Sequence, residues 1–267
     1  MDFIESRDNP RYKDALNVRK GKAAELIYVE GSRLCEEALT SGLKVEQAVF
    51  ARSYYDGGPK DLVSRASSAA GSTLVLKDRL FGSLSDTKNP QGIALVCERP
   101  SASFEAIGSR ISRAETSLPI ALFLNEINNP GNLGAVLRTA EAAGASGVIT
   151  SEGSVDAFSP AVLRGSMGAS FRLPVVEKAS ASEVFEWAKQ AGLRVTVTDS
   201  NASTVYTEAD LTPPSLLVFG SEAHGLSEAA RDSADLSLVI PLENEVESLN
   251  LAVSAGVILF EAQRQKA

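Results

Sequence analysis

Two successive series of short apolar runs, which alternate with helical periodicity, constrain the fold of this chain more than any other feature. The first series has strand-like runs at 26–30, 45–50, 73–76 and 92–97 and helical patterns at 31–41 and 59–70. The second has strand-like runs at 120–124, 146–150, 193–198, 215–219 and 237–241 and helical patterns at 133–143, 160–168, 181–191 and 248–265. Because strands that alternate with helices favour a mainly parallel sheet covered on both faces, the sequence predicts an α/β fold.

The boundary between the two series falls at residues 99–117, where apolar periodicity weakens and Ser, Arg, Glu and Pro predominate. This composition is typical of a linker with one short helix. A chain of 267 residues can bury two modest cores. We therefore expect a smaller α/β domain at 1–98, a linker at 99–117 and a larger domain at 118–267.

Apolar patterning and cysteine usage both favour a cytoplasmic protein that does not enter membranes. No stretch approaches the ~18 to 20 consecutive apolar residues of a membrane span. The initial segment MDFIESRDNPRYKD carries charge where a signal peptide has an apolar core. Cys35 and Cys97 belong to no CxxC pair and have no nearby His, which favours reduced thiols over a disulfide or a zinc site.

The formal net charge of -8 is unevenly distributed along the chain. Residues 1–110 carry 16 basic and 15 acidic side chains, whereas the remainder carries 10 and 19. An acidic protein repels phosphate at long range, which argues against nonspecific nucleic-acid binding. A local basic cluster opposed only by Asp14 consists of Arg11, Lys13, Arg19, Lys20 and Lys22. This cluster is either a solvated helix face or a phosphate-binding site.

The first of three unusual strand ends is the segment Leu124–Ile149, in which a strand enters the turn NPGNLG and then a helix. Gly131 and Gly134 permit a tight turn, and the amino terminus of the helix offers unpaired N–H groups to a nucleotide-like ligand. The spacing is not GxGxxG, and the acidic ribose partner of a dinucleotide fold is missing, so a nicotinamide-linked enzyme is the weaker alternative. Asn132 and Arg138 are the candidate site residues of this segment.

The other two segments also place polar residues just beyond strand ends. In LVFGSEAHGLS, Glu222 can orient a guanidinium or a hydroxyl, and His224 is the only histidine. The absence of a recognisable Ser or Cys nucleophile disfavours a catalytic role for His224. In IPLENEVESLNLAVSAG, Ser248 begins the predicted last helix as a good N-cap residue, and Asn250 follows it. Taken singly, both residues are explained as capping groups.

In this order and spacing, the three segments resemble the SpoU (TrmH-type) family of RNA ribose 2'-O-methyltransferases. The matching motifs are NPGNLGAVLRTA, LVFGSEAHGLS and IPLENEVESLNLAVSAG, which cover about 119–265. The amino-terminal region, with NPRYKDALNVRKGKAAELIYVEGSRLCEEAL and NPQGIALV, resembles the ribosomal-protein-like substrate-binding domain of that family. The acidic loop from Glu243 to Glu247 departs from the pattern of the family, and we expect it to affect how RNA approaches the methyltransferase domain.

The resemblance implies a carboxyl-terminal trefoil-knotted, parallel-sheet methyltransferase domain. It implies that S-adenosylmethionine binds in the knot, largely through backbone groups, at Gly220, Ile240 and Leu249. The family's functional side chains correspond here to Asn132, Arg138, Glu222, Ser248 and Asn250. Methyl transfer of this kind needs no metal. Because arginine remains protonated under ordinary conditions, we expect Arg138 to grip a phosphate and polarise the ribose oxygen, with Glu222 orienting it.

The resemblance also bears on substrate and assembly. The additional amino-terminal domain favours 23S rRNA bound through the basic cluster, with transfer RNA or a non-catalytic RNA-binding module as alternatives. The presence of all the polar motif residues disfavours the non-catalytic alternative. The final helix, at 249–262, is apolar around most of its circumference, which predicts burial on more than one side. We therefore expect a homodimer built on this helix and weakened by a charge at Leu251 or Ile258.

Overall fold

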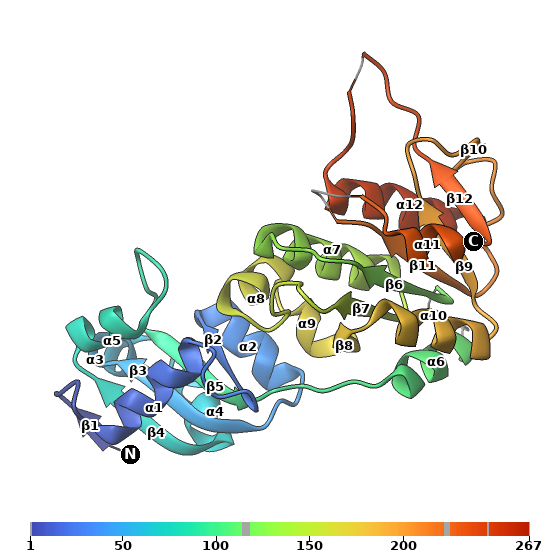
Figure 1. Cartoon of the computed structure of the whole chain (residues 1–267). Coiled ribbons are helices and arrows are strands. Elements are labelled where there is room, and N and C mark those ends of the chain that lie inside the picture. The colour runs from blue at the N-terminus through green and yellow to red at the C-terminus, as the bar shows by residue number, and fades with distance from the viewer. Residues whose placement is uncertain (1, 114–117, 222–224, 245, 267) are drawn as a thin grey trace. The chain divides into compact units, whose positions relative to one another are not determined.

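The computed structural model describes residues 2–113, 118–221, 225–244 and 246–266. The chain divides into two compact units, each with its own sheet (Figure 1). Unit 1 comprises Met1–Pro100 and Phe158–Phe171, and unit 2 comprises Ser101–Ala157 and Arg172–Ala267. Sheets packed with helices in both units confirm the predicted α/β class.

The sheet of unit 1 is mixed and has the strand order β1-β4-β3-β5-β2. Its strands are β1 (Asp2–Ile4), β2 (Leu26–Glu30), β3 (Val45–Ala51), β4 (Ala70–Leu76) and β5 (Ile93–Glu98). Its helices are α1 (Pro10–Arg19), α2 (Ser32–Thr40), α3 (Arg52–Gly57), α4 (Lys60–Ala69), α5 (Asp78–Leu84), α8 (Pro160–Ser166) and most of α9 (Ala169–Arg172). β1, β4 and β3 are parallel, whereas β5 is antiparallel to both β2 and β3.

Helix α1 is not predicted by the apolar periodicity of the sequence. Its apolar period is weak because its buried face consists only of Tyr12, Ala15 and Val18. A local signal is nevertheless present, since the Asn9 side chain accepts a hydrogen bond from the backbone N of Arg11 at 2.9 Å and a proline opens the helix. α1 therefore begins at a cap that is visible in the sequence, although its packing face is not.

The sheet of unit 2 is parallel throughout its described strands and has the order β10-β12-β9-β11-β6-β7-β8. These strands are β6 (Ile120–Leu124), β7 (Gly147–Ser151), β8 (Val175–Ala179), β9 (Arg194–Thr198), β10 (Thr204–Val205), β11 (Ser215–Phe219) and β12 (Leu236–Val239). The helices are α6 (Phe104–Ser112), α7 (Pro130–Ala143), α10 (Ala181–Gln190), α11 (Glu228–Asp232) and α12 (Leu251–Lys266). The order brings the carboxyl ends of β12, β9, β11 and β6 together, at the edge where ligands of such sheets bind.

Two edge strands of unit 2, β8 and β10, are absent from the predicted pattern. β8 pairs with β7 through a register shift between Ile149 and Ser151, and Lys178 has a φ of 58°. A bulge of this kind interrupts the alternation of inward and outward side chains in a strand of only 5 residues. β10 has 2 residues, too few to produce a periodic signal.

Helix α12 begins at Leu251 rather than at the predicted residue 248. Asn250, not Ser248, caps it, because Asn250 Oδ1 accepts a hydrogen bond from the backbone N of Ala252 at 2.9 Å. The helix packs on α7, and its buried residues are Leu251, Ala255, Ile258, Leu259 and Ala262. Leu251 and Ile258 are thus core residues of unit 2, which corrects their expected place in a subunit contact. The exposed apolar side chains of α12 are Val253 and Phe260.

The two cysteines of the chain are both free and buried in unit 1. Burial raises the pKa of Cys35 well above its ordinary value and raises that of Cys97 to about 12. Both are therefore protonated, poorly reactive thiols at neutral pH. Within the described residues, no group of His, Cys, Asp and Glu is arranged to hold a metal ion.

Among the residues that the structure describes, no helix combines the length and the apolar character needed to cross a membrane.

Candidate functional site

A pocket of about 500 Å³ lies in unit 2 where β9, β11 and β12 end and α12 begins. Its polar lining consists of Asn132, Thr198, Asp199, Ser200, Asn201, Ser221, Arg231, Glu247, Ser248, Asn250 and Ser254. Its apolar lining consists of Phe219, Leu226, Leu238, Val239, Ile240, Leu242, Leu249 and Leu251, and Gly220 and Gly225 complete the wall. Apolar walls with a few convergent polar groups suit a nucleoside-like ligand, which has flat apolar faces and polar edges.

The three positions expected to bind the cofactor, Gly220, Ile240 and Leu249, all line this pocket. At Gly220 the backbone of the following loop approaches so closely that a Cβ would lie 2.3 Å from the carbonyl carbon and oxygen of Gly225. The backbone N of Ser221 donates to the carbonyl of Gly225 at 2.9 Å, and the N of Gly225 donates back to the carbonyl of Ser221 at 2.8 Å. This wall is therefore built from main chain, as recognition of an adenosine by backbone groups requires.

Three of the five expected functional side chains, Asn132, Ser248 and Asn250, also line the pocket. Asn250 Nδ2 donates a hydrogen bond to Asn132 Oδ1 at 2.9 Å. Asn129 fixes the first turn of α7 by accepting a hydrogen bond from the backbone N of Gly131 at 2.8 Å. The first and third sequence motifs are thus joined side chain to side chain at the pocket, although 118 residues separate them in the chain.

The remaining expected site residues lie elsewhere. Arg138 is exposed on α7 and does not line the pocket. Its position six residues after Asn132 places it about 9 Å further along the helix axis. An exposed guanidinium at this distance suits contact with a large substrate better than contact with a bound cofactor. Glu222 and His224 lie outside the residues that the structure describes.

The structure adds Asp199, Asn201 and Arg231 to the site, and none of these residues is predicted from the sequence. Asp199 follows β9, and its Oδ1 accepts a hydrogen bond from the backbone N of Asn201 at 2.9 Å. Its Oδ2 lies 3.6 Å from Nε of Arg231 on α11. An acidic residue directly after the strand pattern LRVTVT is a signal that the sequence contains. Its basic partner is separated from it by residues 200–230, and no sequence pattern links the two.

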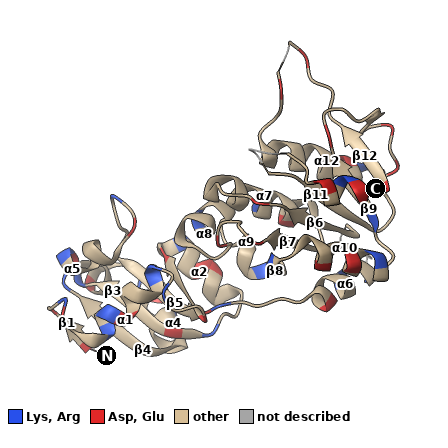
Figure 2. Cartoon of the chain, in the orientation of Figure 1, with Lys and Arg blue, Asp and Glu red and all other residues tan. Residues whose placement is uncertain are grey.

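The predicted RNA-binding cluster lies on α1 of unit 1 and just beyond it, and acidic as well as basic residues occur in this unit (Figure 2). Three of its members form ion pairs, namely Arg11 with Asp2, Lys13 with Asp8 at 3.3 Å and Arg19 with Asp86 at 2.7 Å. Lys20 and Lys22 are exposed. The acidic neighbours reduce the positive potential of the cluster below the value that its sequence suggests.

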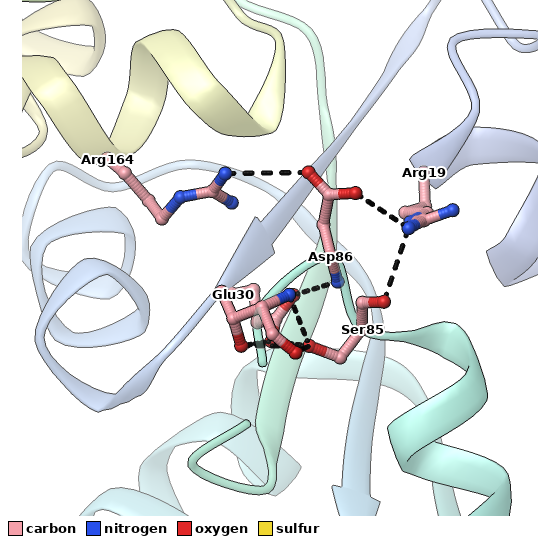
Figure 3. Close-up of polar contacts among 6 residues, drawn as sticks. Arg19, Glu30, Ser85, Asp86 and Arg164 are labelled. Atoms are coloured by element: carbon pink, nitrogen blue, oxygen red, sulfur yellow. Dashed lines mark hydrogen bonds and ion pairs between the residues drawn. The ribbon is translucent and has the colours of Figure 1, made fainter. Parts of the chain in front are cut away.

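Arg19 takes part in a polar network of unit 1 around the loop that follows α5 (Figure 3). Its Nη2 also donates to the carbonyl of Ser85 at 3.2 Å, and Nη2 of Arg164 donates to the other Asp86 oxygen at 3.4 Å. Buried Glu30 accepts hydrogen bonds from the Ser85 hydroxyl and, at 3.3 Å, from the backbone N of Asp86. Arg19 therefore helps to hold this loop, and the two exposed lysines after it are better placed to meet a phosphate.

A parallel α/β sheet with a nucleoside-sized pocket at the carboxyl ends of its strands defines a class of cofactor-binding enzyme domains. Comparison with known proteins narrows this class. Residues 119–260 match the SpoU rRNA Methylase family, and residues 11–95 match the MRM3-like substrate binding domain. The chain belongs to the SpoU rRNA methylase family and is an RNA methyltransferase that uses S-adenosylmethionine.

Individual relatives resemble this chain over almost its whole length. The 23S rRNA (guanosine(2553)-2'-O)-methyltransferase of Bacillus subtilis is 32% identical over 264 residues, which are 97% of this chain and 98% of the relative. The crystal structure of an RNA 2'-O ribose methyltransferase is 34% identical, covers 99% of both chains and has a TM-score of 0.79. The AdoMet-bound rRNA methyltransferase from Sinorhizobium meliloti is 26% identical, covers 100% of this chain and 98% of its own, and has a TM-score of 0.85.

Proposed function

We propose that this enzyme methylates the ribose 2'-hydroxyl of a nucleotide in 23S rRNA. The observation that carries the proposal is the Asn250–Asn132 hydrogen bond at a pocket with a main-chain wall, because it unites the first and third motifs beside the cofactor positions. The substrate assignment is supported by the similarity to the 23S rRNA enzyme of Bacillus subtilis along nearly the entire chain. The similarity to bacterial rRNA methyltransferases supports action in the cytoplasm.

In the proposed reaction the protein aligns a ribose oxygen with the methyl donor. When bound, S-adenosylmethionine supplies an electrophilic methyl group, whose bonding electron pair remains with sulfur as the new O–CH₃ bond forms and the hydroxyl proton leaves. Arg138 grips a substrate phosphate and polarises the ribose oxygen, and it is a poor base because its guanidinium stays protonated. Asn132, Ser248 and Asn250 supply neutral hydrogen bonds that position ribose and cofactor. Glu222 is assigned, by resemblance, to orienting Arg138.

The domain organisation completes the proposal. Residues 1–98 bind RNA, 99–117 form a linker, and 118–267 form the methyltransferase domain with a trefoil knot around the cofactor. The compact units depart from these bounds at two places, because residues 101–113 group with unit 2 and residues 158–171 group with unit 1. The family model for substrate binding, which ends at residue 95, supports the first assignment. The proximity of the three motifs at one pocket supports the last, because a knotted chain is one way to bring such distant segments together.

Methyl transfer to defined RNAs tests the proposal. The purified protein is incubated with methyl-labelled S-adenosylmethionine and either 23S rRNA or transfer RNA, and the products are hydrolysed with alkali. We expect label only from 23S rRNA, in an alkali-stable dinucleotide, because a 2'-O-methyl group prevents attack on the adjacent phosphate. Label in transfer RNA supports that alternative substrate. RNA binding without any transfer supports the non-catalytic module and overturns the proposal.

The basic cluster gives a first prediction. We expect the double variant Lys20→Gln/Lys22→Gln to weaken binding of 23S rRNA and to reduce the slope of log affinity against log salt by about 2, because each lysine neutralises one phosphate. Binding is measured at several salt concentrations, with Lys60→Gln at the start of α4 as the control for a lost surface charge. An affinity and a salt slope equal to those of the wild type would show that Lys20 and Lys22 are solvated surface residues and do not bind phosphate.

A homodimer formed through α12 is the second prediction. Val253 and Phe260 are 50% and 47% exposed, and their spacing of seven residues places them on one side of the helix. We expect light scattering to give about twice the 28.1 kDa chain mass, and Phe260→Asp to reduce it to the mass of one chain because a buried, unpaired carboxylate destabilises an interface.

The control for the dimer is Phe3→Asp, which places the same charge at an apolar side chain of unit 1 that is 53% exposed. This variant is expected to remain a dimer. A wild-type protein that scatters as a single chain at micromolar concentration and is fully active rejects the dimer.

A further inference from the structure

The pocket is lined by charged side chains as well as by the neutral side chains that position ribose and cofactor. Among the lining residues that the structure describes, Asp199 and Glu247 are acidic and Arg231 is basic. S-adenosylmethionine carries a sulfonium and an ammonium against one carboxylate and is a net cation, whereas the demethylated product S-adenosylhomocysteine has no net charge. We infer that Asp199 and Glu247 make this pocket prefer the cationic methyl donor to the neutral product, an inference that rests on the proposed function.

Asp199 is held rigidly at the end of β9. Its backbone N donates to the carbonyl of Leu238 at 2.9 Å, and its side chain accepts the hydrogen bond from Asn201 already described. The Asp199 side chain is only 20% exposed, whereas that of Arg231 is 56% exposed. A cation that remains in solvent at 3.6 Å is screened by water and offsets only part of the charge of a carboxylate on the protein side. Asp199 therefore contributes negative potential to the pocket.

Glu247 adds a second negative charge from the loop between β12 and α12. Glu247 immediately precedes Ser248 and lines the pocket, whereas Glu243 on the same loop does not line it, although both side chains are exposed. The acidic loop that departs from the family pattern thus supplies a carboxylate to the cofactor side of the site. Because Glu247 lines the pocket, its effect on cofactor binding is distinct from any effect of the loop on how RNA approaches.

The expected size follows from Coulomb's law. A carboxylate about 4 Å from a positive charge in a water-like environment contributes about fivefold in binding, and more where water is excluded. Because the product lacks the sulfonium charge, this contribution applies to the donor alone. A negative potential that stabilises the sulfonium also opposes the loss of its positive charge during methyl transfer. The two carboxylates therefore favour binding of the donor and release of the product, and they do not accelerate the chemical step.

Calorimetric titration of the full-length protein with each ligand tests the inference without any RNA. The measured quantity is the ratio of the dissociation constant for S-adenosylhomocysteine to that for S-adenosylmethionine. We expect Asp199→Asn and Glu247→Gln each to lower this ratio by about fivefold, and Arg231→Gln to raise it, because removal of the cation uncovers Asp199. The amide replacements keep the shape of the side chain and one acceptor oxygen while they remove the charge. Asp232→Asn on α11 and Glu243→Gln on the loop are the matched controls and leave the ratio unchanged.

Salt dependence of the wild type provides a second measurement that needs no variant. The ratio is expected to fall as potassium chloride is raised, because salt screens the attraction for the donor more than that for the neutral product. Affinities for both ligands that change equally in the three variants, or a ratio that is insensitive to salt, would overturn the inference. A wild-type protein that binds neither ligand contradicts the proposed function itself, and the two failures are thus distinguishable.

Discussion

Arg138→Ala is expected to lower the single-turnover rate of methyl transfer by about 10²- to 10⁴-fold while leaving S-adenosylmethionine affinity within about twofold. The position of Arg138 explains why the rate falls while the cofactor affinity does not. Arg138 is exposed on α7 and does not line the pocket, so its charge acts on the RNA and the reacting hydroxyl rather than on the cofactor. Alanine is a good helix former, so α7 is preserved.

The measurement is a rapid single-turnover assay with cognate RNA, accompanied by calorimetry with the cofactor. Arg138→Lys is the matched variant, because it keeps the positive charge and loses the planar, two-pronged donor. If bidentate contact with a phosphate is essential, the lysine variant falls between wild type and alanine. A near-normal rate in Arg138→Ala would remove this residue from the site.

Much of the architecture around the site was predictable from local patterns. The strands β6, β7, β9, β11 and β12 are short apolar runs flanked by turn residues, and the structure places them close to the predicted ranges. Parallel strands direct their carboxyl ends to one edge, so the polar residues that follow them lie at the same edge. The hydrogen bond between Asn132 and Asn250 joins the first and third motifs there.

Other features depend on information that local patterns do not contain. Ser248 and Asn250 are both good capping residues two positions apart, and only the three-dimensional structure shows that Asn250 caps α12. The pairing of Asp199 with Arg231 depends on strand order, since α11 comes beside the end of β9 only after the sheet is assembled. Strand β8 carries a bulge that removes its alternation.

Gly220 is the position at which the smallest substitution is expected to have the largest effect on cofactor binding. A Cβ at Gly220 would lie 2.3 Å from the carbonyl carbon and oxygen of Gly225 and 2.5 Å from the backbone N of Leu226. All of these are main-chain atoms, so no side chain can rotate away, and the loop that forms the pocket wall must move. We expect Gly220→Ala to weaken S-adenosylmethionine binding by about 100-fold, because a displacement of this wall disrupts its main-chain contacts to the ligand.

Gly256→Ala on α12 is the matched control for Gly220→Ala. Its Cβ would meet Thr139 Cγ2 at 3.5 Å, an ordinary contact, so the same added methyl group enters unit 2 without displacing any backbone. Glycine inside a helix costs roughly 0.5–1 kcal/mol relative to alanine, so this variant is expected to unfold at an equal or higher temperature and to bind the cofactor normally. Calorimetry and thermal unfolding of both variants make the comparison. If Gly220→Ala binds S-adenosylmethionine as tightly as Gly256→Ala does, the main-chain wall at Gly220 does not contact the cofactor, and the assignment of this pocket as its binding site is wrong.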